Sequence, residues 1–309
     1  MSKENTAVTK KKIKRCKEDV VFDAACFIIL TLVLFVVAYP LYWVIISSIS
    51  APSAVPSGKV LLRPIGFTLK GYAEVFKNDQ VMRGFLNSLI ITFCGVMVNL
   101  IVTLPTSYAL SRSNFSGKKP ITIFYLITMF FGGGLIPTYL VIQRLQMLNT
   151  IWALILPGCL SVYNMIVART FFKSNISEEL YEAAEIDGCT QARFFFQIAL
   201  PLSKAIIAIL VLYYGVGHWN SYFSALVYIS DKAKYPLQLV LRNILITNQT
   251  ALSQTATTAA ARAALQEKQQ LIDVMKYSLI IISSIPVLVM YPLVQKHFVK
   301  GVMIGSMKG

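Results

Sequence analysis

The sequence predicts an all-α membrane protein with six transmembrane helices, and three observations support that fold class. Hydrophobic residues make up 56% of the chain and charged residues only 14%, whereas a water-soluble domain carries about 25% charged residues. Six apolar segments reach the length of about 20 residues that a helix needs to cross a bilayer core of about 30 Å. A cluster of lysine and arginine residues stands shortly before the first of them.

The basic cluster orients the start of the chain. Residues 10–17 read Lys-Lys-Lys-Ile-Lys-Arg-Cys-Lys, and such clusters stay on the cytoplasmic side of a membrane. The apolar run behind them is too long for a cleaved signal peptide and has no clear small-residue cleavage site. We therefore predict a basic cytoplasmic tail over residues 1–20 and a transmembrane domain over residues 21–309.

The six predicted spans follow in order. Several contain proline, as at Pro105, Pro137 and Pro286, which helices in lipid tolerate when neighbouring groups satisfy the freed backbone atoms. With the tail inside, six crossings place both termini in the cytoplasm. The spans cover residues 21–48, 86–110, 120–143, 151–173, 203–229 and 276–296; the loops 111–119 and 174–202 fall inside, and the segments 49–85, 144–150 and 230–275 fall outside.

The outer loop 230–275 has a composition of its own. Its middle, from Thr255 to Gln270, is rich in alanine and glutamine, which favour helix, yet it is too polar to span a membrane. This composition agrees both with a solvated surface helix or loop and with an outer contact surface for a partner.

The net charge of +15 and the five cysteines indicate no separate chemistry. In a multi-span membrane protein, lysine and arginine gather at cytoplasmic flanks and at the anionic lipid surface. No basic helix with interleaved base-reading residues appears, so we expect membrane lipid and no nucleic acid as a partner. The cysteines lack CxxC spacing, so we expect small buried hydrophobes and neither a metal site nor disulfides.

The loop at 174–202 carries the most informative pattern in the chain. Cytoplasmic loops of membrane proteins are usually basic, but this one is acidic on its leading side. Glu178, Glu182 and Glu185 share a helical face by their i, i+4, i+7 spacing, and the apolar Ile186 is expected to pack inward. Gly188 takes a positive φ at low cost and is predicted to end a first short helix.

The order of residues in this loop identifies a family resemblance. Glu182-Ala183-Ala184 is followed by three residues, Gly188, nine residues and Ile198-Ala199-Leu200-Pro201. At every fixed position this order resembles the EAA motif of ABC importer permease subunits. The chain resembles the maltose-type carbohydrate branch of this family, and residues 130–139 and 291–309 resemble the subgroup that handles complex oligosaccharides. The resemblance implies an ABC importer type I permease fold, with 174–202 as a coupling elbow that contacts an ATPase subunit through Glu179, Glu182, Ala183, Ala184, Asp187, Gly188 and Pro201.

The same resemblance implies the function and the partners. It implies a multi-pass permease subunit of the bacterial cytoplasmic membrane that imports oligosaccharides and pairs with a second homologous permease chain. An ATPase dimer would hold ATP and Mg²⁺, and an extracytoplasmic solute-binding protein would contact the outer loop 230–275. The sequence contains no GxxxxGK[ST], so we expect no cofactor, catalytic residue or ATPase site in this chain. The few acidic residues within the spans disfavour a proton-coupled secondary transporter.

The outer half of the fifth span is the candidate substrate pathway. Sugar rings stack their C–H faces on aromatic rings, and their hydroxyls need amide, phenol or imidazole partners. An aromatic belt at the membrane interface is the competing interpretation, and a non-sugar solute or a transporter without an ATPase also stays open. The candidates are Tyr214, His218, Trp219, Asn220 and Tyr222, of which Tyr214, His218 and Ser221 or Tyr222 share a helical face, with Phe131 and Tyr139 in second rank.

Overall fold

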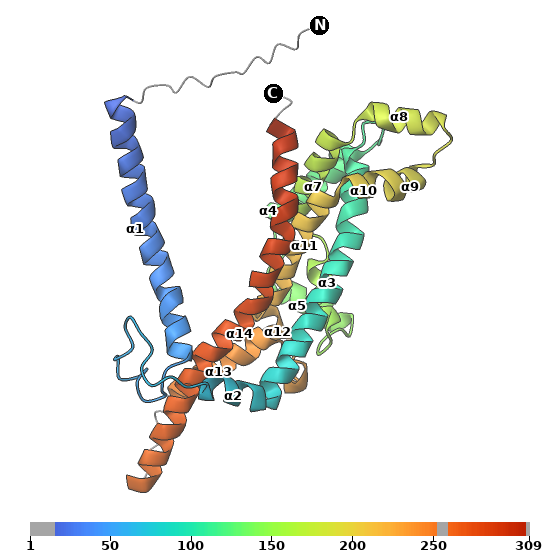
Figure 1. The fold of residues 1–309 in the computed structure, drawn as a ribbon. Coiled ribbons are helices and arrows are strands. Elements are labelled where there is room, and N and C mark those ends of the chain that lie inside the picture. The colour runs from blue at the N-terminus through green and yellow to red at the C-terminus, as the bar shows by residue number, and fades with distance from the viewer. Residues whose placement is uncertain (1–15, 252–258, 307–309) are drawn as a thin grey trace.

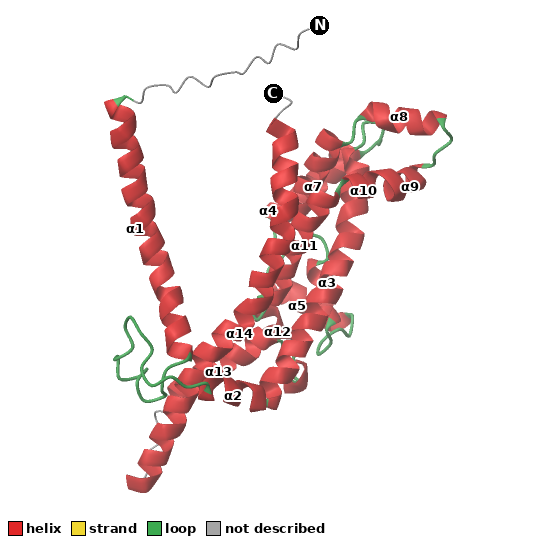
Figure 2. Cartoon of the chain, viewed as in Figure 1, coloured by secondary structure: helices red, strands yellow, loops and turns green. Residues whose placement is uncertain are grey.

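The computed structural model describes residues 16–251 and 259–306, and in these two ranges every regular element is a helix (Figure 2). The elements are α1 Lys17–Ser48, α2 Lys70–Lys77, α3 Asp79–Ser111, α4 Lys118–Phe130, α5 Leu135–Arg144, α6 Trp152–Ile155, η1 Leu156–Gly158, α7 Val162–Asn175, α8 Glu178–Ile186, α9 Gln191–Phe194, the π-helical turn η2 Phe195–Ala199, α10 Leu200–Leu202, α11 Lys204–Trp219, α12 Phe223–Tyr228, η3 Lys232–Lys234, α13 Leu237–Ala251 and α14 Ala259–Ser306.

Three helices of the described ranges are long and apolar enough to cross a membrane unaided. They are α1, α3 and the part of α14 from Gln269 to Pro292. Three more crossings arise only if each of three bent helix pairs counts as one span. The pairs are α4 with α5, bent by 112°, α6–η1 with α7, bent by 52°, and the helical segment Gln191–Leu202 with α11, bent by 80°.

Continuous helices were therefore the wrong expectation for three of the six spans. The third, predicted over 120–143, is interrupted at residues 131–134, where Gly134 has a φ of +85° that residues with a side chain rarely adopt. The fourth, predicted over 151–173, is interrupted at residues 159–161. The fifth, predicted over 203–229, ends at Trp219, so the helical face drawn from Tyr214 does not continue to Ser221 or Tyr222.

The sixth span and the outer loop also differ from their predicted bounds. Residues 259–275, expected as part of the loop 230–275, form the first turns of α14 and run without a break into the span predicted at 276–296. The composition explains this, because alanine and glutamine favour helix and no glycine or proline separates the two stretches. Residues 237–251 of the same predicted loop form α13. The middle of that loop, residues 252–258, lies outside the described residues.

Helix α3 is the centre of the bundle, packing against α7, α11 and α13. Its buried face carries small polar side chains that bind the backbone or side chains of its neighbours. Ser88 Oγ accepts from the Leu237 amide (2.8 Å), and Ser107 Oγ donates to the Met165 carbonyl (3.0 Å). Between them, Asn99 Nδ2 donates to the Gly158 carbonyl (2.7 Å). Lipid offers no hydrogen bonds, so Ser88 and Asn99 satisfy backbone groups that helix ends leave open, and Ser107 links α3 to α7.

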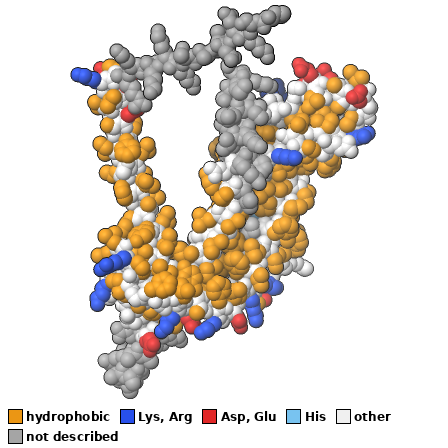
Figure 3. All heavy atoms as spheres, in the orientation of Figure 1, with side chains coloured by type: hydrophobic (Ala, Val, Ile, Leu, Met, Phe, Trp, Pro, Cys, Tyr) orange, Lys and Arg blue, Asp and Glu red, His pale blue; other side chains and the backbone are white. Residues whose placement is uncertain are grey.

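Figure 1 shows how the elements lie relative to one another. The start of α1, the end of α14 and the helices α8 and α9 lie toward one end of the molecule, and α2 and α13 lie toward the other. Helix α1 stands apart from the bundle over most of its length, and none of its most apolar stretch is buried. Figure 3 shows an apolar surface between two ends that carry the charged side chains.

We predict that Asn99→Leu destabilises the protein although it preserves side-chain size. Asn99 is fully buried, and its loss leaves the Gly158 carbonyl and the His218 ring without their partner. Each buried unsatisfied group costs about 1–3 kcal/mol. The temperature of half-unfolding in detergent should fall by several degrees, while Met97→Leu on the exposed side of α3 leaves it unchanged. Equal unfolding temperatures for both variants would contradict this role.

Candidate functional site

The acidic elbow at 174–202 is a helical hairpin whose first turn and last turn are both capped. Ser177 Oγ accepts from the Leu180 amide (3.3 Å) at the start of α8. At its end, Gly188 N–H donates to the Glu185 carbonyl (3.0 Å) and Cys189 N–H to the Ala184 carbonyl (2.9 Å). This pair of bonds is a Schellman motif, which requires a left-handed residue at Gly188. Its φ is +77°, so the prediction that Gly188 ends the first short helix is confirmed.

Aromatic packing holds the elbow on the bundle. Tyr181 is the buried residue of α8, and its ring lies edge-on to Phe194 of α9 with centroids 5.2 Å apart. Tyr108, near the end of α3, contacts Phe194, Phe195 and, from α7, Phe172. Phe194 and Phe172 are almost completely buried. Such ring pairs add about 0.5–1.5 kcal/mol each beyond the area they bury, so α8 and α9 are fixed to the ends of α3 and α7.

An arginine adds a second attachment point. Arg112 follows α3, and its Nη2 lies 2.7 Å from Oε2 of Glu178, an ion pair without the alignment of a directed hydrogen bond. The same guanidinium lies 3.9 Å from the centre of the Tyr181 ring. The Ser113 amide donates to the other oxygen of Glu178 (3.1 Å). The sequence prediction placed Arg112 in the inner loop 111–119, and nothing along the chain indicates that this loop meets α8.

The outward face of α8 differs from the one predicted. Glu178 is tied to Arg112 and is not free on the same face as Glu182 and Glu185. Ile186, expected to pack inward, is 87% exposed. The reason is geometric: the buried Tyr181 sets the inward direction of α8, and position 186 lies on the opposite side of the helix. Glu179, Glu182, Ala183 and Ile186 are exposed and share one face by i, i+3, i+4, i+7 spacing, and Glu185 is exposed beside that face.

The remaining elbow candidates lie outside this face and in different settings. Asp187 and Gly188 are exposed at the end of α8, whereas Ala184 is partly buried against the aromatic cluster. Pro201 is exposed on α10, just before the 80° bend into α11. The π-helical turn η2 precedes it, which agrees with proline having no N–H to complete the α-helical pattern.

The structure divides the predicted pathway residues into buried and exposed ones. Tyr214 is 6% exposed, and its hydroxyl lies 2.7 Å from Oγ1 of Thr103 and accepts from the Ser161 amide (3.3 Å). Trp219 is 2% exposed and donates to the Ser283 carbonyl (2.9 Å). His218 Nε2 lies 2.7 Å from Oδ1 of Asn99. These three side chains are used in packing and in hydrogen bonds within the chain.

The other four candidates lie at helix breaks or on a different helix. Phe131, between α4 and α5, is 77% exposed, and Asn220 and Tyr222, between α11 and α12, are exposed. Tyr139 of α5 is partly buried and stacks on Tyr228 of α12 with centroids 6.2 Å apart. The structure thus brings α5 and α12 together but does not gather all seven predicted residues in one place.

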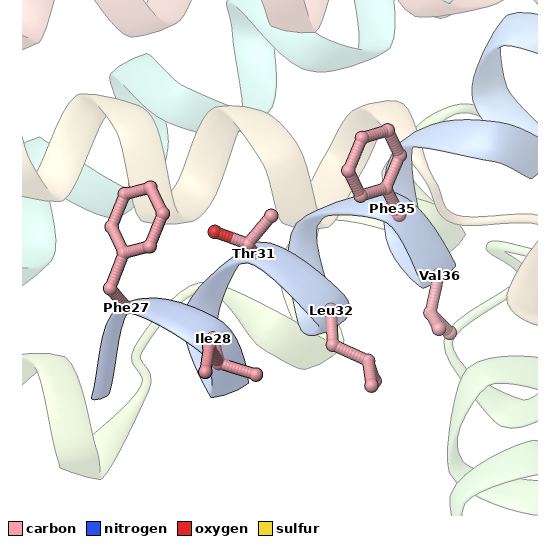
Figure 4. Close-up of a pocket in the computed structure, with 6 residues that line it drawn as sticks. All are labelled: Phe27, Ile28, Thr31, Leu32, Phe35 and Val36. Carbon is pink, nitrogen blue, oxygen red and sulfur yellow. The ribbon is translucent and has the colours of Figure 1, made fainter. Parts of the chain in front are cut away.

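A hollow on α1 is not a comparable site. It measures about 410 Å³ and is lined by six residues of that single helix: Phe27, Ile28, Thr31, Leu32, Phe35 and Val36 (Figure 4). Thr31 supplies the one polar side chain among them. A shallow apolar surface of this kind suits lipid or another apolar helix. Among the described residues, no group of three or more histidine, cysteine, aspartate or glutamate side chains is placed to hold a metal ion.

Comparisons with known proteins identify the family. The polygalacturonan/rhamnogalacturonan transport system permease protein YtcP of Bacillus subtilis (strain 168) is 36% identical over 288 residues, which are 93% of this chain and 98% of that protein. Protein LplC of the same organism is 38% identical over 289 residues, covering 94% of this chain and 95% of LplC. No protein-family model matches the chain.

A solved structure agrees with these relatives. The crystal structure of a bacterial ABC transporter involved in the import of the acidic polysaccharide alginate matches with a TM-score of 0.83 and 27% identity, over 93% of this chain and 100% of that one. The chain therefore belongs to the permease subunits of ABC-type sugar transport systems.

Proposed function

We propose that this permease imports oligosaccharides and is driven by a separate ATPase subunit that docks on the face of α8 formed by Glu179, Glu182, Ala183 and Ile186. The observation that carries the proposal is the contrast within one helix. One side of α8 is fixed to the bundle through Tyr181 and Glu178, while the other is exposed and bears two carboxylates, a small residue and an isoleucine that is 87% exposed.

The composition of the exposed face suits a protein partner. An isoleucine side chain that stays in water contributes no binding free energy, but burying it in a partner cleft contributes about 1.5–3 kcal/mol. Ala183 permits close approach, and the carboxylates of Glu179 and Glu182 supply charge complementarity to a basic rim. The outer side of α8 therefore combines an apolar anchor with charges that set its orientation.

The attachments of α8 give a physical route for transmission. A movement of the docked α8 is passed to α3 through Arg112 and Tyr108, and to α11 through Phe194, Phe195 and the short helix α10. Because these contacts are packed rings and an ion pair rather than a flexible loop, the elbow and the ends of α3 and α7 move as one body.

The proposal includes orientation and partners. The end of the molecule with α8 faces the cytoplasm of a bacterial cell, together with both termini. A second homologous permease chain completes the pathway, and an ATPase dimer holds ATP and Mg²⁺. A solute-binding protein delivers the sugar at the opposite end, where α13 and the first turns of α14 form a contact surface. Support comes from the placement of α1, α8 and α14 in Figure 1 and from the family.

An oligosaccharide is proposed as the cargo because of two similar proteins. YtcP is named for polygalacturonan and rhamnogalacturonan, and the solved importer handles alginate. Reconstitution of the complete importer tests this: galacturonan oligomers presented with the solute-binding protein should stimulate ATP hydrolysis and enter vesicles. Stimulation by a non-sugar solute alone would show that the cargo is not an oligosaccharide. Transport without any ATPase would show that no ATPase subunit drives this permease. Phe131, Tyr139, Asn220 and Tyr222 stay candidates for the pathway, and Tyr214, His218 and Trp219 act as its internal supports.

We predict that Gly188→Val lowers transport roughly tenfold without preventing membrane insertion. The φ of +77° at this position strains a side-chain-bearing residue by about 1–2 kcal/mol, which corresponds to roughly a tenfold change in an equilibrium. A Cβ would meet no atom within 4 Å, so packing is not the cause. Gly188→Asn is the control, because asparagine tolerates this conformation. Equal sugar uptake by both variants would rule out a conformational role.

We also predict that Arg112→Ala uncouples ATP hydrolysis from sugar uptake. The variant removes both the ion pair to Glu178 and the cation–π contact to Tyr181, which together contribute about 1–2 kcal/mol. The number of sugars imported per ATP should fall several-fold. Lys173→Ala, an exposed cation of α7 for which the described residues provide no ion pair, should leave that ratio unchanged. A similar fall in both variants would indicate a general loss of charge.

A further inference from the structure

A groove between α7, α11 and α14 lies on a part of the bundle that the predicted pathway residues do not cover. Its volume is about 470 Å³ and it is as shallow as the hollow on α1, so its lining rather than its size distinguishes it. The lining residues come from three helices that are far apart in the sequence: Asn164, Leu212, Tyr213, Val216, Val287 and Tyr291.

Asn164 is the unusual member of this lining. It is 6% exposed, yet its side-chain amide forms no hydrogen bond with the residues that the structure describes. Its oxygen and nitrogen are not among the fully enclosed unpartnered atoms of the described residues, so the amide is open to the groove and can bind a ligand there. The amide lines the groove, where it presents two donors and an acceptor.

The position of Asn164 is fixed by the break in the fourth span. Ser161 caps α7, and its amide is held by the hydroxyl of Tyr214, while Asn99 holds the Gly158 carbonyl before the break. The buried Tyr214 and Asn99 therefore aim the first turn of α7. From Asn164, α7 continues for about 16 Å before the elbow begins, which places the groove near half the depth of a bilayer core of about 30 Å.

Two phenol rings complete the lining. Tyr213 is 43% exposed and Tyr291 is 58% exposed, and neither hydroxyl bonds to a described residue. Ring faces accept the C–H faces of a sugar, and phenol and amide groups bind its hydroxyls. None of the six lining residues is charged. The groove therefore offers stacking and neutral hydrogen bonds to the ring faces and hydroxyl groups of a sugar.

We infer that this groove is a sugar-contacting segment of the translocation pathway, with Asn164 as the hydrogen-bonding residue and Tyr213 and Tyr291 as the stacking residues. The inference rests on the proposed import of oligosaccharides and names residues for it. Tyr213, the neighbour of Tyr214 on α11, takes the role that the sequence had suggested for Tyr214.

Thiol labelling of the assembled importer tests the inference. Single cysteines replace Asn164, Tyr213 or, as a matched control, Tyr163, in a chain whose five native cysteines are replaced by serine. Tyr163 precedes Asn164 on α7 and is 56% exposed but does not line the groove. A membrane-impermeant methanethiosulfonate should react at positions 164 and 213 roughly ten times faster than at position 163, and saturating galacturonan oligomers should slow both reactions several-fold.

Two results would overturn the inference. Rates at 164 and 213 as slow as at 163 mean that lipid or another chain covers the groove, and labelling that galacturonan oligomers do not slow means that no sugar passes there. Sugar-stimulated ATP hydrolysis by the wild-type importer separates these outcomes from a failure of the proposed function, because it does not depend on this groove.

Transport kinetics provide a second measurement with a variant that preserves volume. Tyr213→Phe keeps the stacking ring and should raise the half-saturating oligosaccharide concentration only two- to threefold, the effect of about one neutral hydrogen bond. Asn164→Leu, which removes the amide, should raise it about tenfold with a smaller change in maximal rate. A reduced maximal rate with an unchanged half-saturating concentration in Asn164→Leu would indicate a structural role instead.

Discussion

The structure depends on satisfying backbone hydrogen bonds where water is absent. Three of the apolar segments are broken or bent, and each break leaves amide or carbonyl groups without helical partners. Around the break in the fourth span those partners come from side chains of α3 and α11: Asn99 binds the Gly158 carbonyl, and Tyr214 accepts from the Ser161 amide. Most small polar residues on the buried face of α3 are therefore structural cross-links, although they resemble the polar residues of a transport path.

This constraint explains how α3 relates the two ends of the molecule. Its polar stripe fixes α7 and α11 in the middle of the bundle, and Tyr108 and Arg112 at its end fix the elbow. Gly95 belongs to the same stripe, because a Cβ there would meet the ring of His218. A single long helix thus contacts the elbow, the break in the fourth span, and α7 and α11, which are two of the three helices that line the groove beside Asn164.

Helix α1 follows a different rule from the rest of the chain. Its apolar stretch is unburied and apolar all round, so packing against the described residues does not fix its direction there. Its last turns are held by contacts to the following loop, where Trp43 donates to the Val60 carbonyl (2.8 Å) and packs edge-on against Tyr277 of α14. Helix α1 is therefore anchored at its C-terminal end, and the apolar stretch before that end is suited to contact with lipid or with an apolar partner.

Hydrophobicity and the need for a positive φ are properties of short stretches of chain, so the membrane class, the apolar segments and the turn of the elbow at Gly188 could be predicted from the residues alone. The packing of the helices sets four features that residue patterns did not predict: where the helices break, that Ile186 points outward, that Arg112 pairs with Glu178, and that Tyr213 rather than Tyr214 faces a groove. In helices that are apolar on every side, periodicity does not distinguish the faces. The direction of each side chain then depends on partners that lie far away in the sequence.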